Sequence, residues 1–265
     1  MLAAAIDQEA FRRFERDGWN RLYAGYHDEW EHLTTQIIPA MLDAAQVGAG
    51  AAVLDVACGP GYVSAAATAR GAVTQGLDLS EKMVELARRL HPGLTFRTGD
   101  AEALPFDDQP FDAVLINFGV LHFPDADRAL AEAFRALKPG GRLAFSNWDG
   151  PKGSAIGIAG VAIAKAGSLD LDLPEGTPVF RFAEHDECRR VLTQIGFQDI
   201  ACTNIPLTWV LPNPPNLMDS FRRATARTSG MLEAQDPARL PAIDAAMTEA
   251  CMPYVKGDRT ELPMP

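Results

Sequence analysis

The chain has 265 residues and a mass of 28.6 kDa, enough for one large domain or for a domain with a sizeable insertion. Hydrophobic residues make up 47% of it and charged residues 22%, proportions that exclude a disordered, collagen-like or disulfide-scaffold chain. The net charge is −11 and no basic stripe interrupts the acids, so we expect no nucleic-acid partner bound through its phosphates.

Four cysteines lie far apart and form no C-x-x-C pair, which argues against a zinc site and is typical of a reducing compartment. The opening segment Met1–Ile6 is apolar, but no basic residue precedes it as one would in a signal peptide. The longest apolar stretch, Ala155–Ala164, is too short to span a membrane. We therefore expect a cytoplasmic protein without a membrane partner.

Residues 1–46 contain no proline before Pro39, and apolar and aromatic side chains recur there near helical spacing, which predicts N-terminal helices. From residue 51 the pattern changes to short β-prone runs that alternate with helical segments. The expected strands are Ala52–Ala57, Val73–Asp78, Leu94–Thr98, Phe111–Asn117 and Arg142–Trp148, and the expected helices are Tyr62–Arg70, Ser80–Leu90 and Asp125–Leu137. Such alternation predicts an α/β fold with a doubly wound parallel sheet.

After Gly150 the chain becomes rich in glycine and other small residues, which suggests an insertion over the edge of the sheet. A helix over Glu184–Ile195, stopped by Gly196, and a strand over Ile200–Leu211 follow. Two more helices are expected at about Leu217–Gly230 and Pro237–Met252, and they could form the surface of a homodimer. The last residues, Arg259–Pro265, carry two prolines that do not suit a central strand.

The segment Val53–Ser64 is the most informative one. A strand ends at Cys58, Gly59 and Gly61 occupy the turn, and a helix begins near Tyr62. Doubly wound sheets bind ligands beside such a turn, because glycine lets the ligand approach the backbone. The spacing also resembles the NAD fingerprint, with Asp78 placed 17 residues beyond Gly61, so a NAD(P)-dependent oxidoreductase remains an alternative.

Two acids favour a different ligand. Asp55 lies inside the first strand, where it would place a carboxylate beneath the glycine turn, suited to an ammonium group rather than a pyrophosphate. Asp100 ends the third strand in the run G-D-A-E-A-L-P-F. One carboxylate for a ribose and another for the amino edge of a purine would fit an adenosine that carries no phosphates.

In these motifs, residues 53–148 resemble the class I S-adenosylmethionine-dependent methyltransferases, in their small-molecule, ubiquinone/menaquinone-methyltransferase-like branch. L-D-V-A-C-G-P-G is similar to the first motif of that family, G-L-D-L-S to its acidic second-strand end, and G-D-A-E-A-L-P-F to its adenine-side motif. F-D-A-V-L-I-N-F-G-V-L-H-F and L-K-P-G-G-R-L match the fourth- and fifth-strand signatures. The resemblance implies a Rossmann-like sheet of seven strands, of which the last is short or missing here.

The resemblance also implies a role for each matching position. Gly59 and Gly61 would pack against the methionine part of the cofactor, Asp55 and the backbone of Asn117 would lie near its ammonium group, and Asp78 would accept both ribose hydroxyls. Asp100 would bind the adenine amino group, with the Ala101 N–H and Leu79 against the ring. The remaining cofactor contacts that we predict are Tyr26, from an N-terminal helical lid, and Ala57, Cys58 and Phe118, from the ends of the strands. We interpret Cys58 as a small turn residue rather than a nucleophile.

His122 follows the fourth strand, where the transferred methyl group would emerge, and is our candidate catalytic base; capping the following helix is the alternative. We predict that Trp19, Tyr23, Trp148 and Phe180 bind the substrate, although the N-terminal aromatics could equally be ordinary core contacts. The apolar run 153–167 is the candidate substrate cover. His27 and His32 stand five apart rather than in the spacing of a helical zinc motif, so we expect no metal.

We therefore predict a methyltransferase that transfers the methyl group of S-adenosylmethionine to a small molecule and releases S-adenosylhomocysteine. A protein that keeps the pocket without methylating, such as a cyclase or a regulatory module, remains an alternative. The predicted division is a helical lid over 1–46, a cofactor-binding core over 47–149, a cap insertion over 150–182, and a C-terminal part of the core with added helices over 183–265.

Overall fold

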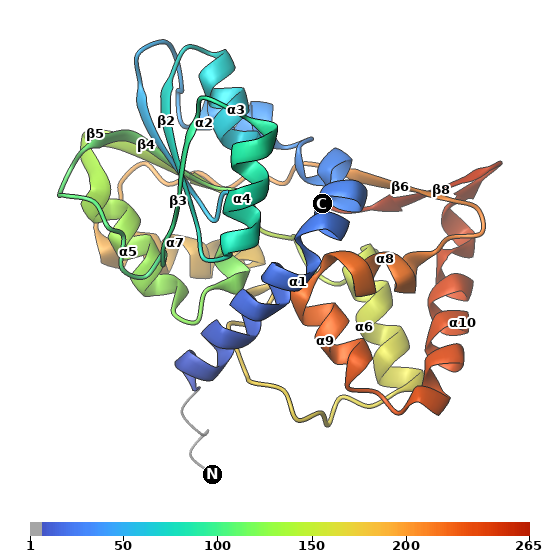
Figure 1. Ribbon diagram of the computed structural model, residues 1–265. Helices are drawn as coiled ribbons and strands as arrows, with labels where there is room; N and C mark the ends of the chain where they lie inside the picture. The colour runs from blue at the N-terminus through green and yellow to red at the C-terminus, as the bar shows by residue number, and fades with distance from the viewer. Residues whose placement is uncertain (1–6) are drawn as a thin grey trace.

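The computed structural model describes residues 7–265; the first six residues, including the start of the predicted lid, lie outside the described range. Its main sheet has five parallel strands in the order β3-β2-β1-β4-β5 (Figure 1). The strands are β1 (Ala52–Val56), β2 (Val73–Asp78), β3 (Thr95–Thr98), β4 (Phe111–Ile116) and β5 (Leu137–Phe145). The predicted α/β fold class is confirmed, and each of the five expected strands overlaps an observed one.

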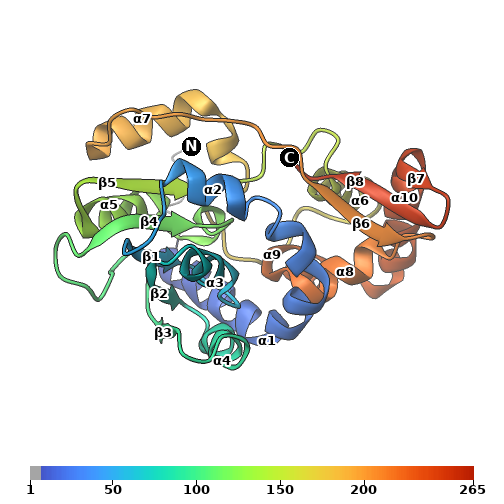
Figure 2. The ribbon, with the colours of Figure 1, turned by 90° about the horizontal axis from the view of Figure 1, so that it is seen from above.

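Helices cover both faces of this sheet, as Figure 2 shows from above. They are α2 (Ile38–Ala44), α3 (Tyr62–Ala69), α4 (Glu81–Leu90), α5 (Ala126–Ala136) and α7 (His185–Ile195). Alternate residues of β1 take part in the two layers, because Leu54 packs with α5 and α7 while Val53 packs with α2 and α3. The Ser80 hydroxyl accepts the Met83 N–H and so begins α4, and Gly196 ends α7 in a left-handed conformation, as the sequence predicts.

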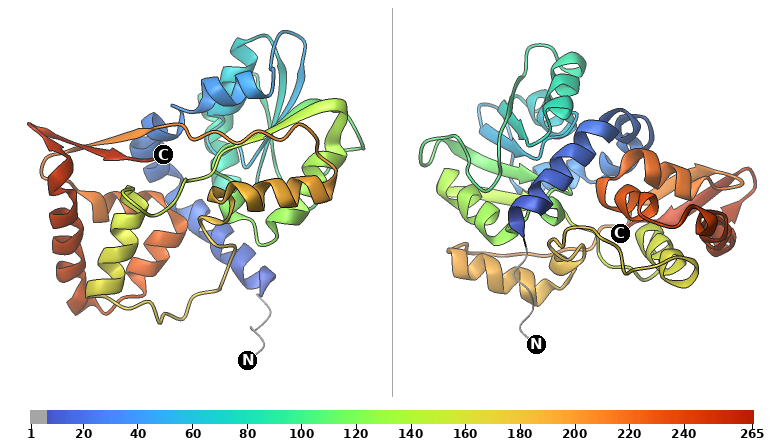
Figure 3. Two further views of the ribbon diagram at one scale, coloured as in Figure 1. Left: turned by 180° about the vertical axis from the view of Figure 1, so that it is seen from behind. Right: turned by 60° about the horizontal axis from the view of Figure 1, so that its bottom comes forward.

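The long helix α1 (Gln8–Thr34) lies between the sheet and a second, mainly helical part of the molecule (Figures 1 and 3). Asp7 caps its first turn by accepting the Ala10 N–H at 3.0 Å. The second part consists of α6 (Ala155–Ala166), α8 (Leu217–Ala224), α9 (Ala226–Glu233), α10 (Leu240–Cys251) and the antiparallel strands β6 (Thr208–Pro212), β7 (Val255–Lys256) and β8 (Arg259–Pro263). Its own core gathers around Trp30 of α1 and Trp209 of β6.

The described residues also include four short 3₁₀ segments: η1 (Val120–His122), η2 (Arg181–Ala183), η3 (Pro237–Arg239) and η4 (Met252–Tyr254). Among residues 7–265, none of the helices combines the length and apolarity that crossing a bilayer requires.

The C-terminal strands differ from the prediction. The expected strand over 200–211 begins only at Thr208, and β6 and β8 pair with each other in a separate sheet ordered β6-β8-β7 instead of extending the main sheet. The physical reason is visible in β6, where Trp209 and Leu211 are buried while Val210 between them is 43% exposed. Such alternation suits a sheet with one covered face, whereas a strand covered by helices on both faces needs apolar residues throughout.

Candidate functional site

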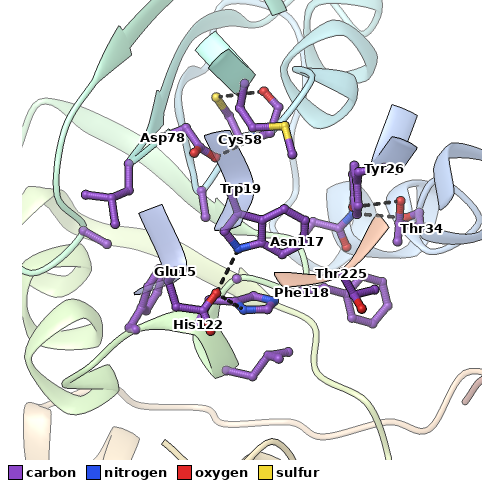
Figure 4. Close-up of a pocket in the computed structure, with 18 of the residues that line it drawn as sticks. Glu15, Trp19, Tyr26, Thr34, Cys58, Asp78, Asn117, Phe118, His122 and Thr225 are labelled. Carbon is purple, nitrogen blue, oxygen red and sulfur yellow. Dashed lines mark hydrogen bonds and ion pairs between the residues drawn. The ribbon is translucent and has the colours of Figure 1, made fainter. Parts of the chain in front are cut away.

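A single cavity opens at the carboxyl ends of β1, β2, β3 and β4, where a doubly wound sheet is expected to bind its ligand. α1 lies along one side of it, η1 and Trp148 beyond the end of β5 form another wall, and residues of α6, α8 and α9 complete the lining (Figure 4). The sheet and the helical part of the molecule thus share one site, and α1 forms part of its wall.

The β1–α3 turn forms one end of the cavity. Asp55 is fully buried at the end of β1, and its Oδ2 accepts both the backbone N–H of Ser64 (2.9 Å) and the Ser64 hydroxyl (2.7 Å). Its Oδ1 is equally buried and has no hydrogen-bond partner among the described residues. An unpaired buried carboxylate oxygen is costly, so a donor brought by a ligand would be stabilised there.

The backbone of this turn is held open for a ligand. Ala57 and Gly59 both have positive φ, at +54° and +50°, and a Cβ placed on Gly59 would meet nothing within 4 Å. Gly61 also has a positive φ (+86°), but a Cβ there would lie 2.7 Å from the Phe96 ring. Gly59 therefore leaves room in the cavity, and Gly61 leaves room for core packing.

Burial dominates the titration of Asp55. Removal from water, opposed by the two hydrogen bonds from Ser64 and assisted by the nearby charge of Asp78, raises the pKa of Asp55 to about 7. The ligand-free site therefore binds a proton at Asp55 in mildly acidic solution. A cationic group at the unpaired oxygen would replace this proton.

Asp78, at the end of β2, connects two elements of the site. Its Oδ2 accepts the Gly59 N–H and its Oδ1 accepts the Ser80 N–H, each at 2.8 Å. Burial raises the pKa of Asp78, although these two bonds and the charge of His122 oppose the shift. Because a carboxylate offers about four acceptor positions, Asp78 retains capacity for two more donors.

Asp100, after β3, is held by α1. Its Oδ2 lies 2.9 Å from Nε of Arg12, and its Oδ1 accepts the Glu102 N–H at 2.9 Å. Arg12 also contacts the buried carboxylate of Glu102 at 2.5 Å. The N-terminal half of α1 is therefore tied to the sheet by an ion pair at the rim of the cavity.

The C-terminal half of α1 is tied at the end of β4. The side-chain amide of Asn117 donates to the Thr34 carbonyl at 3.0 Å, and its oxygen accepts the Ser146 hydroxyl at 2.8 Å. Thr34 also accepts the Tyr26 hydroxyl at 3.2 Å. Burial raises the pKa of Tyr26 to about 12, so this tyrosine remains a neutral donor at physiological pH.

Glu15, Trp19, His122 and Arg227 form a polar cluster on the part of the wall that α1, η1 and α9 provide. The buried Oε2 of Glu15 accepts the indole N–H of Trp19 at 3.0 Å and lies 3.0 Å from Nδ1 of His122, as Figure 4 shows. Nε of Arg227 is 3.7 Å from Oε1 of the same carboxylate. Capping of α5 needs no histidine, because Asp125 accepts the Arg128 N–H there.

The remaining wall is apolar. Phe118, with φ of +52°, stacks on Trp148 with ring centroids 3.8 Å apart and planes at 15°. Ile156 of α6, Val179 and Phe221 of α8 continue this wall. The cavity thus joins an acidic, backbone-lined end with an aromatic end.

The structure brings most of the predicted site residues to this one cavity. Those that line it are Trp19, Tyr26, Asp55, Ala57, Cys58, Gly59, Asp78, Leu79, Asp100, Ala101, Asn117, Phe118, His122 and Trp148. Three others do not: Gly61 faces the core, Tyr23 is half-buried on α1 away from the lining, and Phe180 packs against the second core while its neighbour Val179 reaches the cavity.

Sequence reasoning missed Arg12, Glu15, Thr34 and Arg227. Glu15 had a signal, because it falls on the buried stripe of α1 formed by Phe11, Gly18 and Leu22, and an acid on such a stripe needs a partner. No sequence signal pointed to Arg227, because its neighbours in space, Leu121 and Thr177, are far away in the sequence.

Burial, assisted by the charges of Asp55 and Asp78, raises the pKa of the Cys58 thiol well above its ordinary value, which fits its interpretation as a turn residue.

Over residues 7–265, His, Cys, Asp and Glu side chains form no group of three that could hold a metal ion. His27 instead contacts the hydroxyl of Tyr62 through Nδ1.

Comparison with known proteins gives a consistent result. Residues 54–145 match the family described as "Methyltransferase domain". The chain is 40% identical over 111 residues to the demethylmenaquinone methyltransferase of Renibacterium salmoninarum, and the matched residues make up 42% of this chain and 47% of that protein. It is 34% identical over 174 residues to the ubiquinone/menaquinone biosynthesis C-methyltransferase UbiE of Bartonella henselae, covering 58% and 66%. The chain thus spans about half to two thirds of the length of these relatives.

Among solved structures, the cyclase SpnF matches with a TM-score of 0.55 and 19% identity over 98% of this chain and 96% of that one. This likeness extends the fold similarity over nearly the whole chain.

Proposed function

We propose that residues 54–145, which match a methyltransferase domain, form a class I, S-adenosylmethionine-dependent methyltransferase core, and that the chain transfers a methyl group from S-adenosylmethionine to a small molecule. When bound, this compound supplies an electrophilic methyl group on a sulfonium. Asp55 would hold its ammonium group, Asp78 its ribose hydroxyls, and Asp100 with the backbone of Ala101 its adenine.

The observation that supports this assignment best is the unpaired, buried Oδ1 of Asp55 beside Gly59. It lies in a turn that a dinucleotide would fill with a pyrophosphate, where the carboxylates of Asp55 and Asp78 would repel phosphate. An ammonium group supplies both a hydrogen bond and the opposite charge. The residues present therefore fit a phosphate-free nucleoside with an amino-acid tail.

Methyl transfer is a displacement in line with the carbon–sulfur bond, so the contribution of the protein is to align the acceptor and exclude water. Holding two reactants in such an orientation can supply roughly 7–11 kcal/mol of the barrier. Trp19 and Tyr26 of α1 would cover the cofactor, and the stacked Phe118 and Trp148 would seat an apolar acceptor opposite the methyl group.

Isothermal titration calorimetry with S-adenosylhomocysteine and, separately, with NADH tests the proposal. We expect S-adenosylhomocysteine to bind the wild-type chain and NADH not to bind. A chain that binds NADH and leaves S-adenosylhomocysteine unbound would be an oxidoreductase instead. Incubation of metabolite mixtures with S-adenosylmethionine carrying an isotopically labelled methyl group would then identify the acceptor by its mass shift.

A further inference from the structure

The polar cluster around Glu15 is not explained by cofactor binding. It lies on the part of the wall formed by α1, η1 and α9, and its carboxylate is only 1% exposed. Three elements approach this carboxylate. Its Oε2 contacts Trp19 on its own helix and His122 on η1, while its Oε1 makes no hydrogen bond among the described residues and lies 3.7 Å from Nε of Arg227 on α9.

The surroundings of Glu15 set the direction of its hydrogen bonds. Arginine side chains stay protonated in proteins. The guanidinium of Arg227 is held in place, because it donates to the carbonyls of Leu121 and Thr177 and lies over the Phe11 ring at 5.0 Å. The indole N–H of Trp19 can only donate. The indole N–H of Trp19 donates to Oε2 and the guanidinium of Arg227 lies beside the same carboxylate, so the Oε2 of Glu15 acts as an acceptor.

This carboxylate determines the tautomer of His122. Since Oε2 accepts, the Nδ1 of His122 must carry the hydrogen of their 3.0 Å contact. In a neutral imidazole the other nitrogen is then a free acceptor. Nε2 makes no hydrogen bond within the described part of the chain, and His122 lines the cavity. The edge-on Trp19 ring, 5.1 Å away, fixes the plane of the imidazole.

We propose that Glu15, held by Arg227, is a positioning residue that keeps His122 in its Nδ1–H tautomer, so that Nε2 takes a proton from the acceptor during methyl transfer. This inference rests on the proposed function and specifies its acceptor: an apolar molecule whose nucleophile forms by loss of a proton, such as a phenol or an enol, rather than an amine. The aromatic wall beside His122 suits the apolar part of such a molecule.

The step balances without a further reactant. Nε2 takes the proton from the acceptor O–H, and the electron pair of the oxygen, or of a conjugated carbon, forms the new bond to the methyl carbon. The electron pair of the carbon–sulfur bond returns to sulfur, which leaves a neutral thioether. The imidazolium then passes its proton to solvent.

The tautomer can be measured without knowing the natural acceptor. In the wild-type chain with S-adenosylhomocysteine bound and with ¹⁵N-labelled histidine, we expect the neutral His122 to be protonated at Nδ1. Glu15→Gln should populate the Nε2–H tautomer, while Asp17→Asn, which removes an exposed charge from the same helix, should leave it unchanged. A wild-type His122 protonated at Nε2, or one that Glu15→Gln does not alter, would overturn the proposal.

Turnover gives an independent readout. With 1-naphthol as the acceptor probe, we expect His122→Ala and Glu15→Gln to lower kcat by about 100-fold. The affinity of both variants for S-adenosylhomocysteine should stay within about threefold of wild type. Equal kcat in His122→Ala and wild type would refute the role of the base. The proposed function fails by a different result, namely no binding of S-adenosylhomocysteine to the wild-type chain.

Discussion

Replacement of Asp55 by asparagine should make the ligand-free protein more stable and the site unable to bind its ligand. Both hydrogen bonds from Ser64 go to the same oxygen, Oδ2, so the single carbonyl oxygen of asparagine can accept both. The amide nitrogen then takes the place of the unpaired Oδ1. The substitution removes a buried charge without removing a contact.

The magnitude follows from the titration of Asp55. Burial raises its pKa from 3.8 to about 7, and at roughly 1.4 kcal/mol per unit this corresponds to about 4 kcal/mol of destabilisation. Because the folded state holds the proton more tightly than the unfolded state, the stabilising effect of that proton is fully present below pH 4. It is lost as the pH rises through about 7, so the free energy of unfolding of the ligand-free wild type should fall across this window.

Urea unfolding at pH 5 and pH 8 measures this difference. We expect the free energy of unfolding of Asp55→Asn to exceed that of wild type at pH 8, by up to about 4 kcal/mol, and the gap to narrow at pH 5. Asp112→Asn is a matched control of opposite sign, since hydrogen bonds from Lys138 and the Ala52 N–H lower the pKa of Asp112, and its replacement should destabilise the fold at pH 8.

Asp55→Asn should lose affinity for the ligand although it gains stability. S-adenosylhomocysteine should raise the Tm of wild type and leave that of Asp55→Asn unchanged. Below about pH 7 the ammonium must displace the proton on Asp55, so the wild-type affinity should fall with decreasing pH, by up to tenfold per unit. An Asp55→Asn variant less stable than wild type at pH 8, or one that binds the ligand as tightly, would refute this reasoning.

Three further outcomes are expected. Gly61→Ala sets a Cβ 2.7 Å from Phe96 at φ +86° and should lower the free energy of unfolding by at least about 2 kcal/mol. Gly59→Ala should lower it by only about 1–2 kcal/mol and mainly weaken the binding of S-adenosylhomocysteine. Equal stability losses of the two variants in chemical denaturation would contradict this contrast. Arg12→Ala leaves Glu102 buried without its ion pair and should cost about 1–3 kcal/mol in urea unfolding, and an unchanged midpoint would show that the pair contributes nothing. Cys58 should resist thiol reagents at pH 8 while the half-buried Cys202 reacts, which mass spectrometry of the labelled peptides would decide.

The half of the site that we propose binds the cofactor could be predicted from local sequence. β1, the glycine turn and the start of α3 are contiguous, and their turn chemistry is written in neighbouring residues. Asp78 ends β2 while Asp100 and Asn117 follow β3 and β4, and the carboxyl ends of parallel strands meet at one edge of the sheet. Knowledge of the strand positions was therefore enough to bring these side chains together.

The wall formed by Glu15, His122 and Arg227 could not be predicted in this way. Glu15 meets His122 across 107 positions of sequence, and Arg227 reaches Leu121 across 106. The pairing of β6 with β8 was equally out of reach, because a strand does not encode which edge it joins. That choice depended on where Trp209 and Leu211 could be buried.

The sequence alone thus determined the elements whose signals are local: the period of each strand and helix, the turn after β1, and the acids at the ends of the strands. Only the tertiary structure decided that α1 completes the cavity, and that a carboxylate on it faces a histidine on η1. The reason is that dihedral preferences and periodicity act over a few neighbouring residues, whereas the partners of buried aromatic and charged side chains are selected by the packing of the whole chain.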